Sequence, residues 1–347
     1  MNRFSPLLRG LRHWGLPPVL GALSVFGFAP VHLFPLPILC IALLFASVLH
    51  NPERVFARAF LFGLGWFLAG VYWVYISLHD MGQLPAPIAV AATLGFSMLL
   101  ALFPALALWL AARAEVGERW RWLVLAPILW ALMEWLRGWL LTGFPWQAVG
   151  YSQVPWSPLA GYAPILGVYG VSWLAALSAG FLALRWRAGW LLLAAFWLAG
   201  YALQRVEWTH PVGAPISVSM VQGNISQETK FLPEKLAETL AMYRQKVGDR
   251  ETRLVILLET DLPACIEERP KWFLEELAEP MRARGGDLIT GIAEMETGER
   301  YYNSMISLGA SPQQRFRIQI ARGFIREENQ GIVDHGPGKL RPPLHPS

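Results

Sequence analysis

Long apolar segments, separated by short polar or proline-containing stretches, fill residues 1–204. A helix needs about 20 apolar residues to cross a bilayer, and about seven segments approach that length. They cover roughly residues 12–29, 32–50, 57–78, 86–112, 120–141, 163–184 and 188–204. Proline inside several of them, such as Pro104 and Pro127, is tolerated in membrane helices. This pattern predicts a multi-span α-helical membrane domain.

The pattern changes after residue 204, where short apolar runs alternate with amphipathic stretches. The runs that predict strands are residues 215–225, 253–260, 287–295 and 300–310. Helices are predicted between them, at residues 233–249 and 270–286. Alternating strands and helices, with nearly continuous apolar strands, are typical of an α/β arrangement. We therefore expect an α/β domain over residues 205–314.

The amino-acid composition also indicates that one part of the chain lies in the membrane and the other part is soluble. Hydrophobic residues make up 54% of the 347 positions and charged residues only 16%, whereas a soluble domain carries about 25% charged residues. The net charge of +4 comes without any lysine/arginine cluster, which argues against a nucleic-acid partner. The two cysteines, Cys40 and Cys265, lie in different parts, so neither a disulfide framework nor a metal site is expected.

Loop charges predict the orientation of the membrane domain. One set of alternate loops carries Arg3, Arg9, Arg12, Arg54, Arg58, Arg113, Arg119, Arg121, Arg185 and Arg187. The other loops, "VHLFPLP", "LHDMGQLPAP" and residues 142–162, contain no lysine or arginine. Because cytoplasmic loops are rich in these residues, the N-terminus is predicted to be cytoplasmic. Seven spans would place the soluble part on the opposite side, the periplasm of a bacterium.

The segment from Glu134 to Tyr162, "EWLRGWLLTGFPWQAVGYSQVPWSPLAGY", is aromatic and rich in glycine and proline. Its tryptophans suit the headgroup region of a membrane. Glu134 and Arg137 are three residues apart near a helix end and can pair on one face. Two interpretations stay open at this point: an interfacial belt with a satisfied ion pair, or a platform that grips lipid headgroups. The residues that would form the platform are Glu134, Arg137, Phe144, Pro145 and Trp146.

Glu259 ends the apolar strand "VILLE" and is the leading catalytic candidate. Sites in α/β sheets gather at the carboxyl ends of strands, and a carboxylate flanked by leucines has a raised pKa that suits a general base. The alternative is a solvated loop acid. Four further polar residues could orient a substrate or merely stabilise turns and strands: Gln222, Asn224, Tyr302 and Asn303.

A nucleophile is harder to identify. Cys265 is followed by Glu267 and Glu268, which would suppress its thiolate, and Cys40 lies in an apolar segment and suits packing. The histidines show no metal-ligand spacing, and no G-x-S-x-G elbow is present. A transporter is also disfavoured, since no ionisable group lies well inside a predicted span.

The motifs together resemble one family. "FGFAP" in the first span and "EWLRGWLLTGFPWQAVGYSQ" before the sixth are followed in order by "VQGNI", "ETDLP", "GIAE" and "YYNS". This combination is similar to apolipoprotein N-acyltransferase of the bacterial inner membrane. The resemblance covers roughly residues 15–312, and the long tryptophan-rich string is its most specific part.

The resemblance implies a nitrilase-like αββα sandwich and a Glu-Lys-Cys triad. A phospholipid is then the acyl donor, and the acceptor is the α-amine of a diacylglyceryl apolipoprotein. The chemistry needs no cofactor and no metal. Glu259 matches the family's general base, although Leu258 stands where proline is usual. Phe231 falls near the position of a family tryptophan after "VQGNI".

The resemblance stops near Arg315. The family continues with a lysine-bearing segment similar to "LVPFGE" and a later cysteine, whereas this chain reads "FRIQIARGFIREENQGIVDHGPGKLRPPLHPS". Residues 315–347 are therefore expected to be a divergent, disordered tail. Lys339 lies in its Gly/Pro-rich end and does not replace the missing lysine. A frameshift or premature stop is one explanation, which reading the gene past the codon for Arg315 would test.

Two functions follow from these patterns. The first is a membrane N-acyltransferase by family, inactive as it stands because the triad's lysine and cysteine are missing. The alternative is a non-catalytic remnant that binds phospholipid through its membrane part. A shortened sheet would also leave an unpaired edge and an uncovered face, which predicts instability or aggregation.

Overall fold

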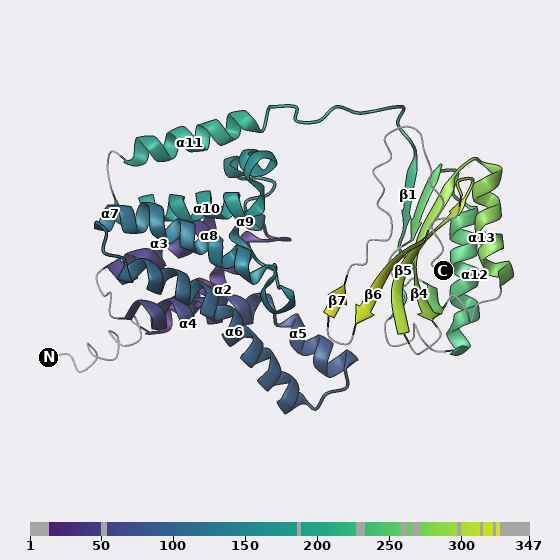
Figure 1. Ribbon diagram of the computed structural model, residues 1–347, viewed down its shortest axis with the longest axis horizontal. Coiled ribbons are helices and arrows are strands. Elements are labelled where there is room, and N and C mark those ends of the chain that lie inside the picture. The colour runs from purple at the N-terminus through teal and green to yellow at the C-terminus, as the bar shows by residue number, and fades with distance from the viewer. Residues whose placement is uncertain are drawn as a thin grey trace, which may run out of the picture. The chain divides into compact units, whose positions relative to one another are not determined.

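The computed structural model describes residues 14–49, 54–185, 189–226, 233–257, 262–265, 271–296, 300–312, 315–321 and 324–326. The chain divides into two compact units, Met1–Pro211 and Val212–Ser347. The first is helical and the second is built around a sheet (Figure 1). The predicted fold class, a multi-span helical region followed by an α/β part, is confirmed.

Helices account for every predicted apolar segment of the first unit. In chain order they are α2 (Leu16–Ser24), η2 (Val25–Gly27), α3 (Pro35–Leu49), α4 (Val55–Gly70), α5 (Trp73–Ile76), η4 (Ser77–Met81), α6 (Ala86–Arg113), α7 (Glu118–Trp120), η5 (Arg121–Leu125), α8 (Ala126–Arg137), η6 (Leu140–Thr142), α9 (Val149–Ser152), η7 (Pro158–Tyr162), α10 (Ala163–Leu184) and α11 (Gly189–Leu203).

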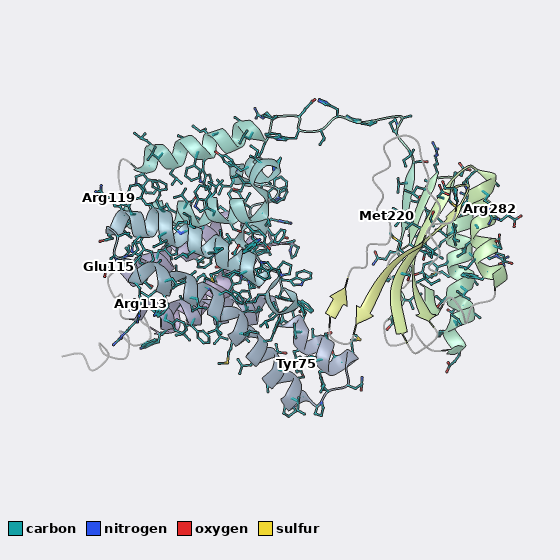
Figure 2. The ribbon with its side chains drawn as sticks, viewed as in Figure 1. Tyr75, Arg113, Glu115, Arg119, Met220 and Arg282 are labelled. Atoms are coloured by element: carbon teal, nitrogen blue, oxygen red, sulfur yellow. The ribbon has the colours of Figure 1, made fainter. Side chains whose placement is uncertain are left out.

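Two of the described helical segments, α6 and the stretch Pro158–Leu184, which is kinked at Gly167, are long and apolar enough to cross a membrane. A third span results if Val55–Gly70 and Trp73–Met81, which meet at a 51° bend, act together. Shorter apolar helices are Leu16–Gly27, Pro35–Leu49 and Gly189–Leu203. The division into about seven spans therefore stays a prediction. Figure 2 shows Arg113, Glu115 and Arg119 at one end of the helical unit and Tyr75 at the other.

Helices α2 and α4 approach each other closely because both carry glycine at the contact. A Cβ atom added at Gly21 would lie 1.9 Å from the carbonyl oxygen of Phe62, and one at Gly65 would lie 2.0 Å from that of Pro18. Small residues let backbones of membrane helices pack in this way. Helix α4 also packs against α6, α6 against α8, and α8 against α10, so the core lies among these helices.

The second unit contains one mixed sheet. Its strands are β1 (Val218–Val221), β2 (Leu254–Leu257), β3 (Leu262–Cys265), β4 (Asp287–Glu296), β5 (Arg300–Gly309), β6 (Arg315–Ala321) and β7 (Phe324–Arg326). The order is β1-β2-β4-β5-β6-β7, with β3 also paired to β4. β1, β2 and β4 are parallel, as is the β3–β4 pair, and the strands from β4 to β7 are antiparallel. Helix α12 (Pro233–Gly248) connects β1 to β2, and α13 (Lys271–Ala283) precedes β4.

Strands β6 and β7 lie in the segment that the sequence predicted to be disordered. The run "RFRIQIA" places apolar residues at every second position, which is a strand pattern. β6 pairs with β5 from Tyr302–Gln319 to Ile306–Arg315. Residues 327–347 lie outside the described part of the chain.

Helices α12 and α13 cover one face of the sheet, and the core between them includes Tyr243, Phe273, Val255 and Leu288. The other face is partly open: Met220 is 78% exposed and Met305 43% exposed. Figure 2 shows Met220 on the side of the sheet away from Arg282 of α13. Within the described residues the unit thus has one helix layer and one sheet, not a complete αββα sandwich.

Candidate functional site

Glu134 lies on α8 with only 7% of its surface exposed. Its Oε1 atom accepts hydrogen bonds from Trp130 Nε1 at 2.9 Å and from the backbone N–H of Val149 at 3.0 Å. The first bond joins two residues four apart on one helix, and the second reaches across the loop to the start of α9. The carboxylate therefore fixes where the loop re-enters the helical unit.

Arg137, one turn further along α8, is 3% exposed and binds the same loop at two other points. Its guanidinium donates to the carbonyl oxygens of Phe144 at 2.7 Å and Trp146 at 2.5 Å. It also lies over the ring of Phe67, 5.1 Å from the centroid. Hydrogen bonds from a charged donor are stronger than neutral ones, so Arg137 holds residues 144–146 firmly against α8 and α4.

The expected ion pair between Glu134 and Arg137 is not formed. Ion pairs between described side chains are Lys235–Glu238, Arg244–Glu276 and Arg282–Glu275, all in the other unit. Both α8 side chains instead bind backbone groups of the loop, because those buried groups have no partner in a helix or sheet and must be satisfied somewhere. The spacing of three residues places both side chains on one face of the helix, but their hydrogen-bond partners are backbone groups of the loop.

The backbone of the loop needs such support. Leu141, Thr142 and Gln147 all have positive φ, at 54°, 76° and 59°, a region that residues with a Cβ atom rarely occupy. Conformations of this kind persist only where surrounding contacts impose them. The bonds from Arg137 to Trp146 and from Val149 to Glu134 lie on either side of Gln147 and impose its conformation.

An aromatic cluster forms where the loop meets α5 and α6. The ring of Phe144 lies 4.9 Å from that of Phe96 and 6.4 Å from that of Trp73. Trp146 lies 5.7 Å from Trp73. The sequence pointed to Phe144 and Trp146, but Trp73 and Phe96 were missed, since they lie on other helices and carry no motif.

Several rings of the segment remain exposed: Trp139 is 53%, Trp146 57% and Trp156 66% exposed. Pro145, between the two residues bound by Arg137, is exposed as well. Exposed tryptophan at the end of apolar helices is typical of the membrane–water interface. The segment can therefore present aromatic rings to lipid headgroups while its backbone stays fixed.

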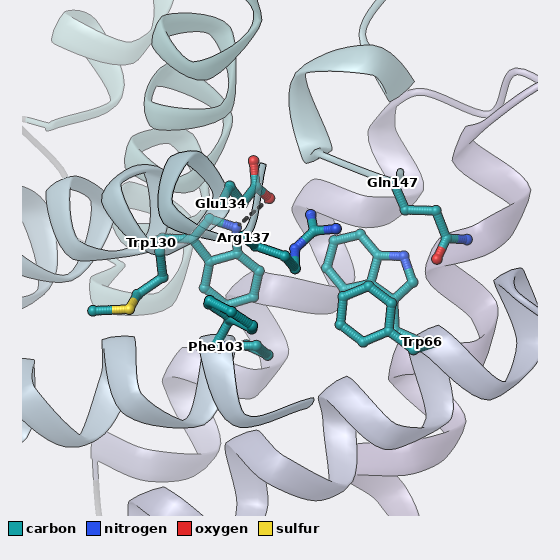
Figure 3. Close-up of a pocket in the computed structure, with 9 residues that line it drawn as sticks. Trp66, Phe103, Trp130, Glu134, Arg137 and Gln147 are labelled. Carbon is teal, nitrogen blue, oxygen red and sulfur yellow. Dashed lines mark hydrogen bonds between the residues drawn. The ribbon is translucent and has the colours of Figure 1, made fainter. Parts of the chain in front are cut away.

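A small cavity of about 20 Å³ lies beneath this loop, between α4, α6 and α8 (Figure 3). Glu134, Arg137 and Gln147 line it together with the rings of Trp66, Phe103 and Trp130. Gln147 packs on the end of α4, where a Cβ atom at Gly70 would lie 1.5 Å from its Nε2 atom. Neither Trp66 nor Gln147 was a candidate from the sequence.

In the second unit, Gln222 and Asn224 follow β1 and are exposed. Asn224 has a φ of 51°. Val221, the last residue of β1, is in register with Leu257, the last residue of the parallel strand β2. The two strands therefore end at the same edge of the sheet, where α/β sites gather.

The remaining candidates are only partly visible. Glu259 and Phe231 lie outside the described residues. Tyr302 and Asn303 lie on β5, where their backbones pair with Glu294 and Ala293, and their side chains are outside the described part. Catalytic and substrate roles for these four residues stay predictions. Among the residues that are described, no group of three His, Cys, Asp or Glu could hold a metal.

Comparisons with known proteins agree with the resemblance. A family model described as the apolipoprotein N-acyltransferase N-terminal domain matches residues 20–181. An apolipoprotein N-acyltransferase of Nitrosomonas europaea is 46% identical over 86% of this chain and 62% of its own length. One from Chromobacterium violaceum is 43% identical over 83% of this chain and 57% of its own. A putative apolipoprotein N-acyltransferase of Bordetella parapertussis is 37% identical over 93% and 67%. The chain thus spans about three fifths of the length of the first two relatives.

Proposed function

Since this chain belongs to the apolipoprotein N-acyltransferase family, we propose that it keeps the phospholipid-binding part of that family's reaction, the phospholipid-dependent N-acylation of the lipidated N-terminal cysteine of apolipoproteins. The observation that carries this proposal is the aromatic loop between α8 and α10, which Glu134 and Arg137 hold at the end of membrane helices. A water-insoluble acyl donor has to be met at the membrane surface, and this loop offers exposed rings there.

The proposed phospholipid contact involves Trp146, Trp156 and Pro145. Phe144 and Trp73, the neighbours of Trp146, are packed together, so the ring of Trp146 stands on a packed aromatic base. Rigid aromatic anchors lose little conformational entropy on binding. Glu134 and Arg137, being buried and bonded to backbone, act by positioning this contact rather than by touching a headgroup.

The proposed chemistry assigns the general base to Glu259. In the reaction that the family resemblance implies, a cysteine thiol loses its proton to this carboxylate and attacks the donor ester. The lysophospholipid leaves as an alcohol, and the lipopeptide amine then attacks the thioester. A lysine stabilises the oxyanion. Residues 315–347 do not match the lysine segment that the family carries at this point, so we propose that this chain binds phospholipid without completing acyl transfer.

The proposed location is the bacterial inner membrane, with the N-terminus in the cytoplasm and the sheet-containing unit in the periplasm. Support comes from the arginine asymmetry of the loops. The charged connection from Arg113 to Arg119 also lies at the end of the helical unit opposite Tyr75 (Figure 2).

One reconstitution tests both halves of the proposal. The purified chain in phosphatidylethanolamine vesicles receives a diacylated lipopeptide. Two quantities are measured: the N-acylated peptide, and the phospholipid that stays bound to the chain (the retained phospholipid). We expect retained phospholipid and no N-acylated product. The double substitution Trp146→Ala with Trp156→Ala should lower the retained phospholipid, whereas Trp190→Ala, an exposed tryptophan on α11, should not.

The outcomes separate the two parts. N-acylated peptide formed by this chain would overturn the claim that it does not complete acyl transfer. Phospholipid retention that is equal in the loop double variant and in Trp190→Ala would overturn the role of the aromatic loop.

A further inference from the structure

Two arginines of the helical unit each lie over a tryptophan ring. The guanidinium of Arg113, the last residue of α6, lies 4.4 Å from the ring centroid of Trp109. That of Arg54, immediately before α4, lies 5.5 Å from the ring centroid of Trp14. Both arginines are exposed, and neither has a carboxylate partner among the described residues. A guanidinium stacked on a ring keeps the N–H groups in its plane free to bind an anion.

The packing of α4 against α6 brings the two arginines to the same end of the unit. A Cβ atom added at Gly63 of α4 would lie 2.8 Å from the side chain of Pro104 on α6. Val71, further along α4, shares a buried cluster with Leu100, which lies earlier on α6, so the two helices are antiparallel. Both arginines lie nine residues from the first of these contacts, one toward the start of α4 and the other toward the end of α6.

An exposed apolar stripe on α6 leads up to Arg113. It consists of Leu99, Leu102, Leu106 and Leu110, which are between 36% and 41% exposed. Steps of three or four residues place these leucines and Arg113 on one face of the helix. Because α6 is long and apolar enough to cross a membrane, the stripe suits contact with hydrocarbon chains, and the guanidinium stands where the headgroups begin.

The charged residues that follow α6 do not neutralise the two arginines. Glu115 and Glu118 are exposed and, within the described part of the chain, form no ion pair with either of them. Arg121 is engaged elsewhere, since it donates to the carbonyl oxygens of Ala114 at 2.7 Å and Val116 at 3.1 Å. Two unpaired cations therefore remain beside an apolar helix face.

We propose that this end of the helical unit binds anionic phospholipids, with the headgroup at Arg54 and Arg113 and an acyl chain along the leucine stripe of α6. Unpaired cations at a membrane surface favour a headgroup with net negative charge over a zwitterionic one. A free anion would leave the stripe without a partner. The surface is also distinct from the aromatic loop, because Phe96, which packs on Phe144 of that loop, lies about 25 Å before Arg113 along α6.

Native mass spectrometry of the full chain, purified in detergent and freed of lipid, tests this surface. Palmitoyl-oleoyl phosphatidylglycerol and palmitoyl-oleoyl phosphatidylcholine are titrated separately, and the bound lipid is counted. We expect phosphatidylglycerol to bind at least severalfold more tightly. The double variant Arg54→Gln with Arg113→Gln should lose this preference. Its matched control, Arg244→Gln with Arg282→Gln, removes two charges that form ion pairs in the other unit and should keep it.

Two further measurements test the parts of the surface. Trp109→Leu leaves every charge in place but removes the ring under Arg113, and it should weaken phosphatidylglycerol binding about two- to fivefold, the scale of an exposed cation–π contact. Glycerol 3-phosphate carries a phosphate without acyl chains. At the same concentration as the lipid, it should not displace phosphatidylglycerol.

The wild-type titrations decide the matter even if a variant fails to fold, because equal binding of the two lipids would overturn the proposal. A preference that survives in the Arg54/Arg113 variant, or is lost equally in the control, would overturn the assignment to these arginines. Displacement by glycerol 3-phosphate would overturn the role of the leucine stripe. The double substitution of Trp146 and Trp156 should leave the preference unchanged, so this proposal and that of the aromatic loop can fail separately.

Discussion

Arg137 and Phe144 are bound to each other in both directions. The guanidinium of Arg137 donates to the carbonyl oxygen of Phe144 at 2.7 Å, and the backbone N–H of Phe144 donates to the carbonyl oxygen of Arg137 at 2.7 Å. This reciprocal contact closes the turn from residue 138 to residue 143. It also brings the ring of Phe144 against Phe96, so the end of α8 and the aromatic cluster form one structure.

Replacing Arg137 with lysine should weaken this structure. Lysine keeps the charge, but its ammonium cannot reproduce the planar guanidinium, whose Nη1 atom donates to both carbonyl oxygens while the group lies over Phe67. We expect a loss of about 1.5–3 kcal/mol in stability, the scale of one hydrogen bond to a charged group. Thermal unfolding in detergent measures it. Arg185→Lys, at an exposed helix end, is the control, and equal effects of both changes would contradict the role of the guanidinium.

Glu134 offers a graded test of its contact with Val149. Glu134→Gln keeps an oxygen that can accept from the Val149 N–H, whereas Glu134→Leu leaves that buried donor unsatisfied. The leucine variant should be less stable than the glutamine variant by about 1–3 kcal/mol, the cost of leaving a buried donor unsatisfied. Hydrogen exchange at the Val149 amide should quicken in the leucine variant and stay slow in the glutamine variant. Equally slow exchange in both would show that the carboxylate does not hold this amide.

A side chain at Gly70 would displace the amide end of Gln147, which occupies the space. A Cβ atom there would lie 1.5 Å from Gln147 Nε2, whereas one at Gly95 of α6 would meet nothing within 4 Å. Gly70→Ala should cost about 1 kcal/mol, the low end for overpacking, because the amide end of a flexible side chain can move aside. Gly95→Ala should be neutral or slightly stabilising, since alanine favours the helix. Unfolding midpoints of the two variants compare them directly, and a harmless Gly70→Ala would contradict the packing of Gln147.

The open face of the sheet predicts how the second unit behaves. Met220 is 78% exposed on β1, which is an edge of the described sheet. Exposed apolar edges promote association, and lysine is the residue that natural edges use against it. Met220→Lys in the full chain should reduce the aggregated fraction in size-exclusion chromatography.

The matched control for that prediction is Val255→Lys. Val255 is fully buried on the face that α12 and α13 cover, so an unpaired charge there should unfold the unit. If Met220→Lys proved as disruptive as Val255→Lys, the face that carries Met220 would have to be covered in solution.

Local patterns were enough to locate the helices and most strands. The apolar run at 163–184 coincides with α10 (Ala163–Leu184), and "DLITGIAEM" lies within β4. These assignments succeed because hydrophobic periodicity and length are properties of a short stretch of chain. The strands of residues 315–326 were missed, because the basic and Gly/Pro-rich composition of the whole tail outweighed the short alternation at its start.

The candidate site was only half predictable. The unusual string from Glu134 to Tyr162 marked the loop as important, and the resemblance assigned it to a family that the comparisons confirm. The ion pair that the spacing of Glu134 and Arg137 allows is nevertheless not formed. Spacing shows which side chains share a helix face, but it says nothing of the loop backbone that competes for them.

By itself, then, the sequence determined the two-part organisation, the helical character of the membrane segment and the family, since each depends on composition, periodicity or contiguous motifs. Only the tertiary structure decided which distant residues meet. Trp66 and Gly70 of α4 meet Gln147 of the loop after α8. Their meeting follows from the close packing of α4, α6 and α8. In such packing, the available volume and the hydrogen-bond partners of buried polar atoms depend on several segments at once.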